Sequence, residues 1–114
     1  MEIKIIKNSI SLPEVKKLAE ESYGEMVKAV ADIGQGILAI GGEMHADAEQ
    51  LLLDGGSLQD DLWGFNIYPD ESGDKFLEYV SFINIRPKLG NRSQEISSPE
   101  VRNKIRELVK KIIV

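Results

Sequence analysis

The sequence predicts an α+β fold, with a mixed or mostly antiparallel sheet of about five strands and helices packed on it. Two pairs of apolar runs, each joined by a short glycine-containing loop, are typical of β-hairpins. Helical patterns with clear start signals lie around them, so the predicted order is β-α-β-β-α-β-β-α. The chain has 114 residues, 42% apolar and 29% charged, which is typical of a single domain over residues 1–114.

The N-terminal part predicts one strand followed by one helix. Isoleucines and lysines make residues 2–7 a β-rich run, which predicts a strand. Ser11 and Glu14 form the pair expected of a capping box. Apolar residues then recur at helical spacing, so we predict a helix over residues 12–23 that buries one face against the sheet.

Residues 26–33 fit both a helix and a strand, because their apolar residues satisfy both spacings. The strand is favoured, since a Gly-Gln-Gly turn and a second apolar run follow it. The two runs predict a hairpin with strands over residues 27–33 and 37–41. A helix is predicted next, over residues 46–54, and two glycines end it.

A second hairpin is predicted in the C-terminal half. Aromatic and β-rich residues 62–68 form its first strand, residues 69–75 a polar loop, and residues 76–86 a longer second strand. Apolar residues occur on both faces of the longer strand, so we expect it to be central and covered on both sides. A loop of about 12 residues follows over residues 87–98, and loops of that length are often functional.

The last predicted helix spans residues 98–113 and has two alternative caps, Ser97 with Glu100 or Ser98 with Pro99. The apolar faces of all these elements define the expected core. The residues predicted to be largely buried are Val15, Leu18, Leu38, Ile40, Leu52, Ile67, Phe82, Ile85, Ile105 and Leu108.

Composition and charge argue against several classes of protein. The chain has 19 acidic and 14 basic residues and a net charge of −5, which opposes binding to nucleic acid or anionic membranes. It has no cysteine, which excludes disulfides and thiolate metal sites. No apolar run approaches the roughly 18 residues of a membrane span, and the N-terminus lacks a signal-peptide pattern. We therefore expect a cytoplasmic protein with no nucleic-acid and no membrane partner.

The segment that follows Gly42 contains the only histidine, His45, and three carboxylates, Glu43, Asp47 and Glu49. A helix beginning near His45 places His45 and Glu49 on one face, as a pair suited to acid–base chemistry or metal binding. The candidate catalytic residues are His45, Glu43 and Glu49. The candidate ligands of a divalent metal, such as magnesium or manganese, are His45, Asp47 and Glu49. The alternative is that the acids stabilise a helix start and His45 is a capping or packing residue.

The segment over residues 84–95 combines two arginines with a glycine–asparagine turn. Two guanidinium groups and turn amides can hold a small anionic ligand such as a carboxylate or phosphate. The alternative is a structural network in which one arginine pairs with Glu95 or with acids of the first segment. The spacing matches no phosphate-loop or dinucleotide motif, so no nucleotide cofactor is predicted. The candidate ligand-binding residues are Arg86, Asn91, Arg92 and Ser93.

Three motifs, GGEMHADAE, DLWG and NIRPKLGNRSQE, resemble a small prokaryotic domain-of-unknown-function family, number 5674. The resemblance covers residues 27–112. Met44 stands where the family has leucine, a change that conserves volume. The family has no known activity, so the resemblance implies only that the two polar segments are its most characteristic parts.

Two functions follow from these observations. In the first, the two segments form a site for an anionic ligand or a metal. In the second, the protein is a non-catalytic homodimeric module, in which the same residues form an ion-pair network and Trp63, Phe65 or the apolar end at residues 112–114 lies in the interface. Both predict one contact, in which His45 or Glu49 lies within hydrogen-bond or one-water reach of Arg86, Asn91 or Arg92.

Overall fold

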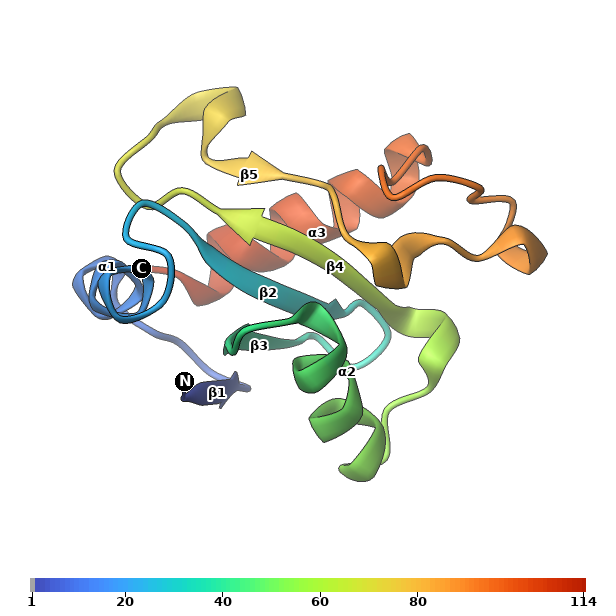
Figure 1. Ribbon diagram of the computed structural model, residues 1–114, viewed down its shortest axis with the longest axis horizontal. Coiled ribbons are helices and arrows are strands. Elements are labelled where there is room, and N and C mark those ends of the chain that lie inside the picture. The colour runs from blue at the N-terminus through green and yellow to red at the C-terminus, as the bar shows by residue number, and fades with distance from the viewer. Residues whose placement is uncertain (1) are drawn as a thin grey trace.

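The computed structural model describes residues 2–114, which form one five-stranded antiparallel sheet (Figure 1). The spatial order is β1-β3-β2-β4-β5, and β2 and β4 pair along their whole length at its centre. The predicted α+β fold is therefore confirmed. The strands are β1 (Ile3–Ile6), β2 (Val27–Asp32), β3 (Ile37–Gly41), β4 (Leu62–Ile67) and β5 (Leu77–Glu78).

Three helices cover the sheet, with α1 and α3 on one face and α2 on the other. Side chains cap the first turns of α1 and α3: Ser11 Oγ accepts from the Glu14 N–H and Ser98 Oγ from the Val101 N–H, both at 3.2 Å. Of the two predicted caps for the last helix, Ser98 with Pro99 is the one used. No helix in residues 2–114 combines the length and apolar content of a membrane span. The helices are α1 (Leu12–Glu21), α2 (His45–Asp54) and α3 (Pro99–Ile112).

The predicted first hairpin is confirmed, and residues 26–33 contain a strand rather than a helix. Its ladder ends at the pair Asp32 and Ile37, and the Gly36 N–H donates to the Asp32 carbonyl at 2.9 Å. Gly36 has a φ of +72°, a conformation that costs glycine little. This turn makes β2 and β3 antiparallel neighbours.

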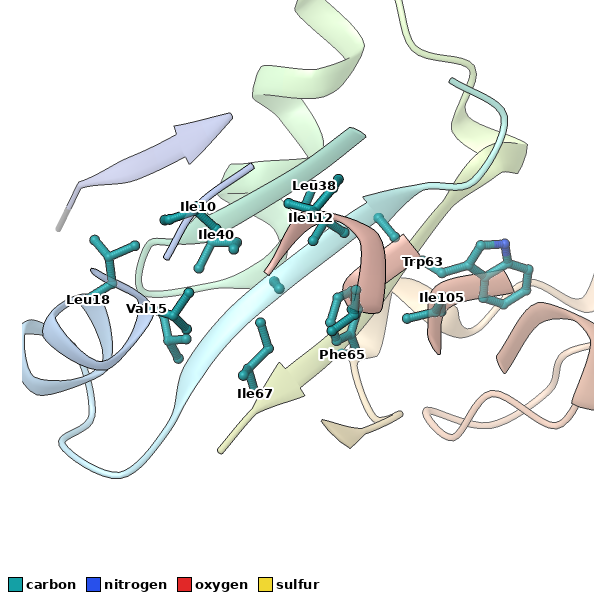
Figure 2. Packing of buried hydrophobic residues seen from close by; sticks show 14 of the residues in the cluster. Ile10, Val15, Leu18, Leu38, Ile40, Trp63, Phe65, Ile67, Ile105 and Ile112 are labelled. Atoms are coloured by element: carbon teal, nitrogen blue, oxygen red, sulfur yellow. The ribbon is translucent and has the colours of Figure 1, made fainter. Parts of the chain in front are cut away.

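The main core lies between the sheet and helices α1 and α3 (Figure 2). A smaller cluster under α2 contains Leu52. Leu108 is only half-buried, because it lies at the border of the helix face that meets the sheet. The predicted core residues that are confirmed, each 5% exposed or less, are Val15, Leu18, Leu38, Ile40, Leu52, Ile67 and Ile105.

The predicted strand over residues 76–86 is wrong, because β5 ends at Glu78. The Val80 N–H donates back to the Glu78 carbonyl at 3.0 Å, which turns the chain out of the ladder. Ser81 then caps a short 3-10 helix over Phe82–Asn84. Serine and asparagine side chains compete with ladder hydrogen bonds in this way, and the apolar alternation masked that signal.

Two core predictions fail with this strand. Phe82 is 73% exposed and Ile85 is 43% exposed. Both would face the core only if the strand continued beyond Glu78, and the turn instead directs them to the surface. The result is an exposed apolar surface in place of two buried side chains.

Asn84 takes the place of a strand residue beside β4. Its Nδ2 donates to the Gly64 carbonyl at 2.9 Å and to the Gln94 carbonyl at 3.0 Å, while its Oδ1 accepts from the Gly64 N–H at 2.8 Å. The two bonds to Gly64 are those that a neighbouring strand residue would make. Position 64 has no room for a side chain, since a Cβ there would lie 2.6 Å from the Ser81 Cβ.

The residues that follow β5, 79–98, are called the edge segment below. The segment is held together by its own backbone, because the Ile96 N–H donates to the Tyr79 carbonyl at 3.0 Å and the Ser81 N–H to the Gln94 carbonyl at 3.1 Å. A bridge between Arg86 and Asn91 closes its tip. The loop expected over residues 87–98 is therefore part of an ordered, hairpin-like segment that lies along the edge of the sheet.

Candidate functional site

The two polar segments meet, and the predicted contact between them is confirmed. An Arg86 Nη2 donates to Glu49 Oε2 at 2.8 Å, which joins the edge segment to α2. The two side chains are only 11% and 14% exposed, respectively. The pair is thus one largely shielded bridge rather than two separate surface charges.

The Arg86 guanidinium is also bound on its other sides. A second Nη atom donates to the Leu62 carbonyl, and the guanidinium carbon lies 5.3 Å from the centre of the Trp63 ring. Stacking on an indole and charge-assisted hydrogen bonds are the interactions that arginine makes best. Glu49 therefore balances the positive charge of Arg86 inside the protein.

Asn91 is 2% exposed and serves as the centre of the edge segment. Its Nδ2 lies 2.8 Å from the Asn84 carbonyl and also within reach of the Ser93 and Glu95 carbonyls. Its Oδ1 accepts from both the N–H and the hydroxyl of Ser97. Every polar atom of this side chain is used inside the fold, which leaves none for a ligand.

The other two candidates of the second segment lie at the surface. Arg92 is exposed, and within residues 2–114 it makes no side-chain hydrogen bond or ion pair. Ser93 is exposed and donates to the Glu95 carbonyl at 3.2 Å. The carboxylate of Glu95 pairs with Arg102 of α3 at 2.8 Å, not with either predicted arginine. The role of Arg92 and Ser93 as ligand-binding residues stays a prediction.

His45 is buried at the start of α2 and is 7% exposed. Its Nε2 lies 2.8 Å from the Phe65 carbonyl of β4, and since a carbonyl only accepts, the neutral ring carries its proton on Nε2. Burial lowers the pKa of His45 below its usual 6.5, and Lys28 nearby acts in the same direction. The hydrogen bond to the Phe65 carbonyl and the nearby Asn66 side chain oppose this shift but do not cancel it. The histidine therefore pins α2 to the sheet in its neutral form.

Glu43 and Asp47, the remaining acids of the first segment, are both exposed. The helix start therefore holds one buried histidine, one ion-paired glutamate and two solvated acids. Within residues 2–114 no three side chains among histidines, cysteines, aspartates and glutamates are grouped closely enough to hold a metal ion. The predicted metal ligands His45, Asp47 and Glu49 are thus on one short helix but do not form a cluster.

One buried polar site was missed by sequence reasoning. Asp32 is fully buried and accepts hydrogen bonds from the Ser57 hydroxyl at 2.6 Å and from the Gln35 side chain at 2.8 Å. Burial raises the pKa of Asp32, but these bonds and those from the Gln35 and Gly34 N–H groups outweigh it, so the pKa lies below 3.8. An aspartate directly before a glycine turn is the signal that could have predicted this turn-stabilising role.

The Glu49–Arg86 pair lies in a hollow of about 440 Å³, called the Phe82 groove below. Exposed apolar side chains surround the pair: Phe82, Ile85 and Leu89 are 73%, 43% and 41% exposed. Asp60 and Lys88 add one charge of each sign. The groove is lined by Glu49, Gln59, Asp60, Phe82, Ile83, Ile85, Arg86, Pro87, Lys88 and Leu89.

Arg86→Ala should lower the free energy of unfolding by about 1–3 kcal/mol, because it leaves the shielded Glu49 carboxylate without its partner. Arg92→Ala removes the same side chain from an exposed position and should change it by no more than about 0.5 kcal/mol. Urea unfolding of both variants measures the difference. Equal losses would show that Arg86 has no special structural role.

The stability of the protein should fall as the pH drops below the unfolded-state pKa of histidine, 6.5, toward the lower pKa of folded His45. In that window the unfolded chain takes up a proton that the folded chain resists. Each unit of pKa difference corresponds to about 1.4 kcal/mol. Urea titrations at about pH 7.5 and about pH 5.5 measure the loss.

The control for this pH effect is His45→Gln, whose side-chain amide can still donate to the Phe65 carbonyl. Its stability should be flatter over the same window. Asp32 does not contribute to this change in stability, because its pKa is lowered from 3.8 and its carboxylate stays ionised across the window. A wild-type stability that is independent of pH across this window would contradict the neutral, buried state of His45.

Comparison with known proteins identifies the family of the chain. No curated protein and no solved structure is significantly similar to the chain. A family described as "protein of unknown function (DUF5674)" matches residues 4–112, nearly the whole chain and both polar segments. The resemblance predicted from the sequence motifs is thereby confirmed. The protein belongs to the DUF5674 family.

Proposed function

We propose that this protein is a non-catalytic module that associates with a second copy of itself through the Phe82 groove. The observation that carries the proposal is the apolar rim of Phe82, Ile85 and Leu89 around an ion pair that is already satisfied. Exposed aromatic and aliphatic side chains grouped around one hollow are typical of interaction surfaces. Glu49 and Arg86 are engaged with each other, which leaves Asp60 and Lys88 as the charges of the groove that a partner can meet.

Charge favours a second copy as the occupant. The chain carries a net charge of −5, so two copies repel one another over most orientations. The groove holds two acids, Glu49 and Asp60, and two bases, Arg86 and Lys88, and is therefore neutral. A patch with both signs can pair with itself about a twofold axis, because each copy offers the charge that the other needs.

The alternative function, a site for a small anion or divalent metal, has less support. Arg86 and Asn91 make internal hydrogen bonds that an anion would have to break. Glu49 is ion-paired, and His45 donates its ring proton to a carbonyl.

Two aromatic residues that were expected at a dimer interface are buried instead: Trp63 is 4% exposed and Phe65 is 0% exposed.

Phe82→Glu should weaken self-association at least about tenfold, because it removes an apolar contact from each subunit and adds two like charges. Sedimentation equilibrium over a concentration series measures the dimer dissociation constant. Val114→Glu is the matched control, since Val114 is 71% exposed and lies at the other predicted interface, outside the groove. A wild-type protein that stays monomeric at millimolar concentration, or a larger effect of Val114→Glu, would overturn the proposal.

A further inference from the structure

A second hollow, of about 1100 Å³, lies between β5 and α3 and shares no residue with the Phe82 groove. It is called the β5 groove below. One wall is the run Phe76–Val80, and the other is the side of α3 that carries Arg106 and Lys110. Figure 1 shows β5 at the outer edge of the sheet with α3 behind it.

The backbone of β5 has an open side toward this groove. The register pairs Asn66 with Glu78 and Ile67 with Leu77, and the Tyr68 N–H donates to the Phe76 carbonyl at 2.9 Å. Hydrogen-bonded pairs alternate along an antiparallel ladder, so Phe76 and Glu78 face β4. The N–H and carbonyl of Leu77 therefore point away from β4, along the open edge of the sheet.

The same edge already accepts an extended segment one step further along. The Tyr79 carbonyl accepts from the Ile96 N–H at 3.0 Å, and Val80 and Glu95 form an antiparallel bridge. This pairing stops at Tyr79, and the β5 groove continues beyond it along Leu77 and Phe76. Residues 97 and 98 then leave this edge, because Ser98 caps α3 and the helix begins at Pro99.

Charged side chains of both signs line the groove: the acids are Glu71, Asp74, Glu78 and Glu95, and the bases are Lys75, Arg102, Arg106 and Lys110. Three of the bases lie on α3, and Glu95 is paired with one of them, so the α3 wall is the basic side of the groove. Leu77, Val109 and Ile113 give it an apolar lining. Arg106 and Lys110 lie one helical turn apart on α3, where Arg106 donates to Asn103 at 3.0 Å and Lys110 lies 3.9 Å from Glu107. These two exposed cations are weakly paired, in contrast to Arg102, which binds both Glu95 and the Ile96 carbonyl.

We propose that the β5 groove binds an extended peptide that carries alternating apolar and acidic side chains on one face, by adding a strand beside Leu77. The backbone of Leu77 supplies two hydrogen bonds to the peptide backbone. Apolar peptide side chains cover Val109 and Ile113, and acidic ones reach Arg106 and Lys110. This surface is separate from the self-association proposed above, so either can fail without the other.

The test uses a fluorescein-labelled peptide of eight residues in the order valine, threonine, glutamate, threonine, repeated twice. Its inward positions then alternate between valine and glutamate. Fluorescence anisotropy with the full chain should show saturable binding. The double variant R106E/K110E should weaken it at least about fivefold and should strengthen binding of the same peptide with lysine for glutamate.

The matched control is the double variant K104E/K111E, which makes the same charge change on α3 at residues outside the groove. It should leave the affinity within about twofold of the wild type, because the charges it alters do not face the groove. Equal weakening by both double variants would show unspecific charge attraction and overturn the proposal. Absence of saturable binding to the wild-type chain would overturn it as well.

Strand addition is tested separately from charge. In an added strand only every second peptide N–H faces the protein, so N-methylation of one alternate set should abolish binding and methylation of the other should not. In ¹⁵N spectra the Leu77 amide should shift on binding. Equal effects of the two methylated sets, or an unchanged Leu77 amide, would refute this mode of binding.

Discussion

Replacing Asn84 with alanine should lower the free energy of unfolding by about 2–6 kcal/mol, because two buried backbone groups lose their partner. The change leaves the N–H and the carbonyl of Gly64 without their partners, whereas the Gln94 carbonyl still accepts from the Ser81 N–H. Each buried polar group without a partner costs about 1–3 kcal/mol. Urea unfolding followed by circular dichroism measures the loss.

Two further variants identify the cause of this loss. Asn84→Asp keeps the oxygen that accepts from Gly64 but loses the donor, and it buries a charge, so it should be no more stable than Asn84→Ala. Asn8→Ala removes an exposed asparagine and should change stability by no more than about 0.5 kcal/mol. If Asn84→Ala resembled Asn8→Ala, the role of Asn84 as a substitute for a strand residue would be wrong.

Ile105→Ala should cost about 2–5 kcal/mol, since Ile105 is fully buried between α3 and the sheet, near Phe65 (Figure 2). Leu108→Ala on the same helix should cost less, because Leu108 is only half-buried. Chemical unfolding of the two variants compares the two sides of the helix. A larger loss for Leu108→Ala would show that α3 packs by another face.

Local signals in the sequence were enough to predict most of the elements. The Ser11 cap, the glycine turn after Asp32 and the Ser98–Pro99 helix start act through neighbours within four residues. Such interactions are visible in the sequence because both partners are close together in it. The predicted order of elements was therefore recovered, except that the last strand is much shorter than expected.

The length of that last strand depends on a partner distant in sequence. The alternation over residues 76–86 favours a strand. The Ser81 side chain, however, packs against Gly64, which lies far earlier in the sequence and has no side chain to exclude it. Asn84 then takes over the hydrogen bonds that a strand would make. The pairing of β4 with this segment decides whether residues 79–86 form a strand or turn away from the sheet. A sequence pattern carries no information on that pairing.

The candidate site was predictable in part for the same reason. An acidic segment and an arginine-containing segment were expected to meet, and Glu49 and Arg86 do. The sequence could not decide which arginine is buried, because Arg86 and Arg92 differ only in their place relative to the turn closed by Arg86 and Asn91. The fold places Arg86 against Glu49 of α2 and leaves Arg92 at the surface.

Trp63 is the only tryptophan of the chain, is 4% exposed, and lies under the Arg86 guanidinium at the junction of the edge segment and the sheet. Indole fluorescence therefore reports on the contact between the edge segment and the sheet, whereas far-ultraviolet circular dichroism reports on all helices and strands. Beside β4 the edge segment is attached through the Asn84 side chain rather than through a long ladder, so it is the part best suited to open first. If the fluorescence transition occurs at a lower urea concentration than the circular-dichroism transition, the edge segment detaches before the rest of the protein unfolds. The measurement needs no added label.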